Sequence, residues 1–215
     1  MAHIVIPRGG VIIKALCIIG SARSNGNTAF VVNKVIEGMY QSGIEVKRYA
    51  LSDMNIDYCR GCNLCNETRK CVQRDDMDQI ISDIFITDIV LIAAPSYWGD
   101  VPGQLKVFID RSLPICDTRK GGNIIPEGKY GISIAIRAGQ RKEENKHIID
   151  TIEHYYSHLH IKPIERYTIE QVLHFSDLKE KGKDLKSLYE LGLNVRKKIV
   201  EIKTLAKDPV IRDGF

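Results

Sequence analysis

The sequence has no long uninterrupted hydrophobic run, which a membrane-spanning helix would require. Its longest apolar stretch, residues 80–94, contains Asp83 and Asp88, whereas a transmembrane helix needs roughly 18 or more apolar residues with few charges. An export signal is not indicated either, because Lys14 interrupts the first apolar run and no small-residue cleavage site follows it. We therefore expect a cytoplasmic protein without membrane contact, beginning with a short tail over residues 1–10.

A dense basic block is also missing. The net charge is only +4, from 31 basic and 27 acidic residues, and there is a single tryptophan. The basic residues of the last fifth alternate with acids and leucines, as on a solvent-exposed helix face, so no nucleic-acid partner is expected. Because repeats and Pro/Gly/Ser-rich linkers are absent too, the 215 residues predict one domain with an appendage.

What is present is an alternation of β-branched apolar runs with helix-period segments. The candidate strands are 11–20, 44–51, 88–95, 130–139 and 161–169, and the candidate helices lie near 28–42, 77–85, 102–113 and 143–159. This alternation predicts an α/β fold with a parallel sheet covered on both faces. We expect Ser176 to cap one or two further helices, which form a C-terminal helical extension over 176–215 that packs on the domain.

A glycine-flanked turn, GSARSNGNTAF, follows the first strand and leads into a helix. Backbone N–H groups at such a helix start attract anions, and this turn adds hydroxyl, amide and guanidinium groups suited to a terminal phosphate. The spacing differs from that of a Walker A loop and of a dinucleotide fingerprint. The alternative is an ordinary turn capped by Asn27. The candidate phosphate ligands are Ser21, Arg23, Asn25, Asn27 and Thr28.

Two more loops follow predicted strands, and ligands of open parallel sheets bind at this edge. Pro95 and Gly99 shape the loop after the third strand, where Tyr97 and Trp98 either flank a planar ligand or pack into the core. After the fourth strand, residues 137–140 form another candidate contact loop.

Four of the six cysteines, Cys59, Cys62, Cys65 and Cys71, fall within residues 59–71. Steps of three residues let a tight coil present successive thiolates to the irons of a [4Fe–4S] cluster. Zinc more usually takes two separated pairs, and a single disulfide would leave two thiols unexplained. The spacing favours the cluster, with zinc, a redox disulfide or unligated thiols as alternatives. We interpret the other two, Cys17 and Cys116, as packing thiols.

Three histidines, His154, His158 and His160, include a pair spaced four residues apart that could hold zinc. No carboxylate or cysteine joins them in a known sequence pattern. A helix face or a subunit contact is therefore favoured over a metal site.

Together, GSARSNGNT, APSYWGDVPGQLKVFIDR and AGQ resemble the NADPH-dependent FMN reductase superfamily, and the CX2CX2CX5C motif resembles that of the iron-sulfur flavoproteins. The resemblance covers residues 12 to about 170. It implies a flavodoxin-like, doubly wound five-stranded parallel sheet of order 2-1-3-4-5 over 11–175, with the cysteine-rich loop after strand 2. It also implies FMN, with its phosphate on the candidate ligands of the first turn. Its isoalloxazine would lie against Pro95, Ser96, Tyr97, Trp98, Gly99, Ala138, Gly139 and Gln140.

The resemblance further implies an FMN-dependent oxidoreductase that passes electrons from ferredoxin or NAD(P)H to an acceptor, with the [4Fe–4S] cluster held by the four loop cysteines. Proteins of this kind form homo-oligomers, dimers or tetramers, in which a cluster approaches a neighbouring subunit's flavin. Basic residues around the cysteines either dock an acidic ferredoxin or are simply solvated: Arg60, Arg69, Lys70 and Arg74. No catalytic side chain is assigned. The alternatives are an FMN-dependent quinone or azo reductase without iron, and a zinc-stapled binding domain without enzymatic activity.

Overall fold

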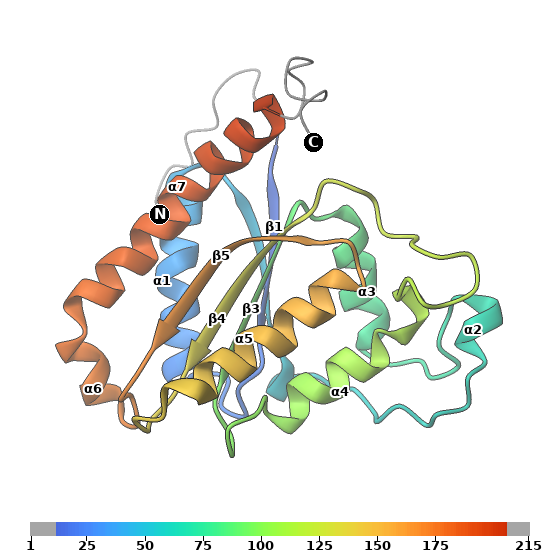
Figure 1. The fold of residues 1–215 in the computed structure, drawn as a ribbon, viewed down its shortest axis with the longest axis horizontal. Helices are drawn as coiled ribbons and strands as arrows, with labels where there is room; N and C mark the ends of the chain where they lie inside the picture. The colour runs from blue at the N-terminus through green and yellow to red at the C-terminus, as the bar shows by residue number, and fades with distance from the viewer. Residues whose placement is uncertain (1–11, 206–215) are drawn as a thin grey trace.

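A computed structural model describes residues 12–205 of the chain, so the predicted tail over 1–10 lies outside the described residues. Five parallel strands form one sheet in the order β2-β1-β3-β4-β5 (Figure 1). Their bounds are β1 Lys14–Ile19, β2 Glu45–Ala50, β3 Ile89–Pro95, β4 Tyr130–Ile136 and β5 Lys162–Ile169. The predicted fold class and strand order are therefore confirmed. The three central strands are buried almost throughout, as their uninterrupted apolar sequences require.

Helices cover both faces of the sheet (Figure 1). On one face lie α1 (Asn27–Gln41) and α7 (Gly182–Leu205), and on the other lie α3 (Met77–Ile86), α4 (Gly103–Arg111) and α5 (Lys142–Ser157). The short elements are η1 (Leu51–Asp53), α2 (Cys65–Thr68), η2 (Leu113–Ile115) and α6 (Phe175–Glu180). Over residues 12–205, no helix combines the length and the apolar character that crossing a bilayer demands.

The C-terminal helix α7 is part of the core. Leu188 and Ile199 are fully buried in the same cluster as the strands and α1. A Cβ added to Gly192 would lie 2.0 Å from the carbonyl oxygen of Val35, so the backbones of α7 and α1 touch. Through α7, the described part of the extension thus forms one wall of the domain.

The predicted cap of the extension is wrong by two residues. His174 is the N-cap of α6, and the carboxylate of Asp177 accepts its backbone N–H at 2.8 Å. Ser176 lies inside the helix. The capping box uses an imidazole in place of the usual hydroxyl, which is why the Ser-based pattern pointed to the wrong residue.

Candidate functional site

The turn after β1 lines a cavity of about 560 Å³ at the carboxyl edge of the sheet. Arg23, Asn25 and Asn27, three of the five candidate phosphate ligands, line this cavity. Ser21 and Thr28 are buried and do not line it. The opposite walls come from segments that the sequence analysis missed, Ser52 and Asp53 after β2 and residues 173–175 after β5. Both segments are far from this turn in the sequence. Only the order of the strands in the sheet brings them to the same cavity.

No acidic side chain in the first turn of α1 offsets the positive end of the helix dipole. The N-cap of α1 is Gly26, and no side chain among the described residues caps the helix. The side chain of Asn27 donates to the carbonyl of Leu173 at 3.3 Å instead, so the alternative of a turn capped by Asn27 is wrong. Free N–H groups and the positive end of a 15-residue helix fit an anionic phosphate.

The loop after β3 projects its aromatic residues outward. Trp98 is fully exposed, with φ of +56°, and Gly99 follows with φ of +76°. Tyr97 is 40% exposed. The hydroxyl of Ser96 donates to Glu144 at 3.0 Å, which ties the loop to α5. The alternative that Trp98 packs into the core is therefore wrong, and its indole is available to a ligand.

The loop after β4 is held from beneath by Arg137, whose side chain is buried. Its guanidinium donates to the carbonyl of Gly139 at 2.9 Å and pairs with Glu170 at 2.6 Å. The residues predicted to contact a flavin, 138–140, are exposed. The backbone N–H of Ser96 donates to Ile136 at 2.7 Å, so the loops after β3 and β4 lie together. The cavity beside α1 is lined by other loops.

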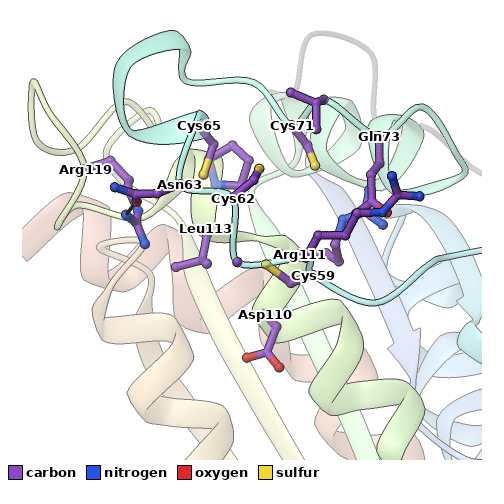
Figure 2. A pocket seen from close by; sticks show the side chains of 14 residues that line it. Cys59, Cys62, Asn63, Cys65, Cys71, Gln73, Asp110, Arg111, Leu113 and Arg119 are labelled. Carbon is purple, nitrogen blue, oxygen red and sulfur yellow. Dashed lines mark hydrogen bonds between the residues drawn. The ribbon is translucent and has the colours of Figure 1, made fainter.

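The four loop cysteines line one hollow of about 260 Å³, and Figure 2 shows their sulfur atoms around this shared space. We call it the cysteine hollow. Positive φ angles at Gly61, Asn63 and Arg69 curl the backbone tightly enough to turn the thiols inward. None of the six cysteines is in a disulfide. Burial raises the pKa of the Cys65 thiol, and the nearby Arg119 opposes that rise.

Both ends of the cysteine loop are fastened to each other and to α4. Asn55 and Asp76 exchange two hydrogen bonds, of 2.7 and 3.2 Å. The buried guanidinium of Arg111 donates to the Asp57 carbonyl and to the Asp75 carboxylate, each at 2.6 Å. The loop is therefore anchored at its base while its thiols remain accessible.

Two guanidinium groups beside the cysteine hollow carry N–H donors without partners. Within residues 12–205, the buried Nε atoms of Arg111 and Arg119 make no hydrogen bond, and both residues line the hollow. Buried donors without partners are rare in folded proteins. Thiolates and inorganic sulfides are acceptors that such donors would satisfy, so the residues present fit an iron-sulfur cluster.

The buried arginine, Arg111, was missed from the sequence. Its burial could have been predicted from its spacing, since Arg111 follows Leu105 and Phe108 at intervals of three residues on the buried face of α4. Four basic residues were predicted either to dock a ferredoxin or to be solvated. One of them, Arg69, instead donates to the carbonyls of Cys116 and Lys120 at 3.2 and 3.1 Å.

A family model described as NADPH-dependent FMN reductase matches residues 13–169. The chain belongs to this family. The predicted resemblance is thereby confirmed, and its iron-sulfur branch is supported by curated relatives. An iron-sulfur flavoprotein of Archaeoglobus fulgidus is 40% identical over 131 residues, which cover 61% of this chain and 57% of the relative. One from Methanocaldococcus jannaschii is 37% identical over 127 residues, covering 59% and 63%. The matches thus span less than two thirds of the length of either relative.

Solved structures of other proteins share the fold of this member of the FMN reductase family. The NAD(P)H:quinone oxidoreductase from Methanothermobacter marburgensis superposes with a TM-score of 0.68 at 13% identity, covering 86% of this chain and 98% of that one. A flavone reductase superposes with a TM-score of 0.67 at 16% identity, covering 89% and 64%. At these identities the likeness concerns the flavodoxin-like fold alone.

Proposed function

We propose that this protein is an FMN-dependent oxidoreductase with a [4Fe–4S] cluster, passing electrons from ferredoxin or NAD(P)H to an acceptor. The observation that carries the proposal is the cysteine hollow, where four unpaired thiols meet the unpartnered donors of Arg111 and Arg119. The family supports the flavin, and the curated iron-sulfur relatives support the cluster.

The residues of the chain would divide the work between two sites. Arg23, Asn25 and Asn27, with the N-terminus of α1, would hold the phosphate of FMN, while the loops after β3 and β4 would border its ring. Cys59, Cys62, Cys65 and Cys71 would ligate the cluster. When bound, FMN exchanges one or two electrons and the cluster one, so the pair links single-electron donors to two-electron acceptors.

The arrangement favours a homo-oligomer. In Figure 1, α2 lies at the right-hand end of the molecule, whereas α6, which adjoins the phosphate cavity, lies at the left. The loop that forms the rim of the cysteine hollow carries three exposed apolar side chains, Tyr58, Leu64 and Val72, and exposed apolar surface of this kind marks contact surfaces. A neighbouring subunit seated on this rim would bring its own flavin to the cluster. A docked donor protein is the other occupant of the same surface.

The test is chemical analysis of the full chain purified without oxygen. We expect flavin, about four irons and sulfide per chain, and loss of iron and sulfide with retention of flavin in Cys65→Ser. Cys17→Ala, which removes a buried thiol that lies outside the hollow, is the matched control and should keep its iron. Flavin without iron in the parent would favour the quinone or azo reductase alternative, and zinc without flavin would favour the binding domain.

A further inference from the structure

A second cluster of metal-ligating side chains lies outside the cysteine hollow. Cys116 and Asp117, which follow η2, meet His158 at the end of α5, and one ligand atom from each lies within 4.8 Å of the others. No known sequence pattern joins a cysteine or a carboxylate to the histidines, but the fold brings together segments separated by 41 positions.

The two segments are pinned to each other by both backbone and side-chain contacts. The backbone N–H of Asp117 donates to the carbonyl of His158 at 3.0 Å. The Nδ1 atom of His158 lies 2.8 Å from Asp117 Oδ1, and the Cys116 Sγ lies 3.6 Å from the same oxygen. A thiol, a carboxylate and an imidazole therefore converge on one point with little freedom to separate.

These distances suit a tetrahedral metal. With metal–ligand bonds of about 2.0–2.3 Å, neighbouring ligand atoms of a zinc site lie roughly 3.3–3.7 Å apart. The sulfur–oxygen separation of 3.6 Å already has this value. The nitrogen–oxygen separation of 2.8 Å is that of a hydrogen bond, and it would open by about half an ångström when a metal replaces the shared proton.

The surroundings of His158 complete the site. Its Nε2 lies 3.3 Å from the Nε2 of His154, so an N–H there can donate to His154 and leave Nδ1 free to bind a metal. His160 lies 3.4 Å from the second oxygen of Asp117 and would orient the carboxylate. Ligating groups are commonly fixed by such outer hydrogen bonds. Each of the three histidines would therefore have a role: His158 as a ligand, His154 as the acceptor for its Nε2–H, and His160 in orienting the carboxylate of Asp117.

We propose that Cys116, Asp117 and His158 bind a divalent transition metal of the zinc class, at a site separate from the four loop thiols. A cavity of about 350 Å³ adjoins the site and is lined by Cys116, His154 and His158 among others. It leaves the fourth coordination position open to water or a small ligand. Because Arg69 donates to the carbonyl of Cys116, the metal also braces the segment on which the cysteine loop rests.

The test uses the full chain with all four loop cysteines replaced by serine, so that the hollow cannot take up zinc. These cysteines lie outside both core clusters, and the background is expected to fold. Zinc added to this protein should bind at one ion per chain in equilibrium dialysis. In the same background, Cys116→Ser and His158→Ala should each weaken zinc binding at least tenfold. His147→Ala, which removes an exposed histidine of the same helix, is the control and should bind as before.

Cobalt provides a second measurement. A Co²⁺–thiolate absorption band should appear in the background protein, persist in His147→Ala and vanish in Cys116→Ser. A thermal melt identifies any variant that fails to fold, and Asp117→Asn then replaces it. Absence of zinc binding in the background, or equal binding in the ligand variants and the control, would overturn the proposal and leave a hydrogen-bonded Asp–His–His chain.

Discussion

The guanidinium of Arg111 donates two parallel hydrogen bonds, of 2.6 and 3.0 Å, to the carboxylate of Asp75. Both side chains are at most 5% exposed. This pair joins α4 to the end of the cysteine loop. Forked contacts of this kind are among the strongest charge-assisted hydrogen bonds. The base of the loop therefore depends on one buried ion pair.

Removing the cation should destabilise the protein strongly. Arg111→Met leaves the Asp75 charge buried without its partner, so the free energy of unfolding should fall by about 3–5 kcal/mol. Chemical denaturation followed by circular dichroism measures the change. Lys106→Met, which breaks an exposed ion pair with Asp110 on the same helix, should cost about 1 kcal/mol or less. Equal losses in the two variants would contradict the role assigned to the buried pair.

The same pair should make stability depend on acid pH. Burial alone would raise the pKa of Asp75, but hydrogen bonds from Arg111 and from the backbone of Asp57 and Met77 lower it below its ordinary value. The native state thus releases this proton more readily than the unfolded chain. Its contribution is complete above about pH 5, where the unfolded chain has also released the proton, and is lost as the pH falls through the lowered pKa.

The variant Asp75→Asn removes that titration. The stability difference between parent and variant should therefore be largest near neutrality and shrink as the pH falls from about 5 to 2. Denaturant titrations at several pH values measure it. A difference that stays constant over this range would show that Asp75 titrates no differently in the folded and unfolded states.

The phosphate assignment can be separated from general flavin binding by comparing two ligands. Arg23→Ala should weaken FMN binding by about 10- to 100-fold, the loss expected for one charge-assisted hydrogen bond. Riboflavin lacks the phosphate, so its affinity should change little. Fluorescence titration of the flavin-free protein gives both values. A similar loss for both flavins would place Arg23 away from the phosphate.

Close packing of α7 on α1 predicts an intolerant glycine. In Gly192→Ala the new methyl group would meet the Val35 carbonyl, and the strain should cost about 1–3 kcal/mol despite the better helix propensity of alanine. Gly182→Ala, at the start of the same helix, meets nothing within 4 Å and should be neutral or slightly stabilising. Thermal melts of the two variants decide the matter, and equal melting temperatures would be inconsistent with the contact.

Local patterns were sufficient to predict the strands, the main helices and the cysteine loop. Period-2 and period-3.6 repeats report burial of nearby residues, and clustered thiols are evident in one short segment. Long-range pairings leave no such local trace. Arg111 meets Asp75 across 36 positions, and His158 meets Asp117 across 41. Only the strand order and helix packing bring these partners together, so the base of the loop and the histidine cluster were missed.

The closed base of the cysteine loop has a consequence for how this fold can change. Asn55 and Asp76 already lie side by side, so the chain between them leaves and re-enters the domain at one place. Loop-closure entropy grows only slowly with length when the ends are held together. The chain between Asp57 and Asp75 can therefore change in length without rearranging the sheet, as long as both residues remain to pair with Arg111. Gain or loss of a metal-binding module between these two residues requires no change in the strands beneath it.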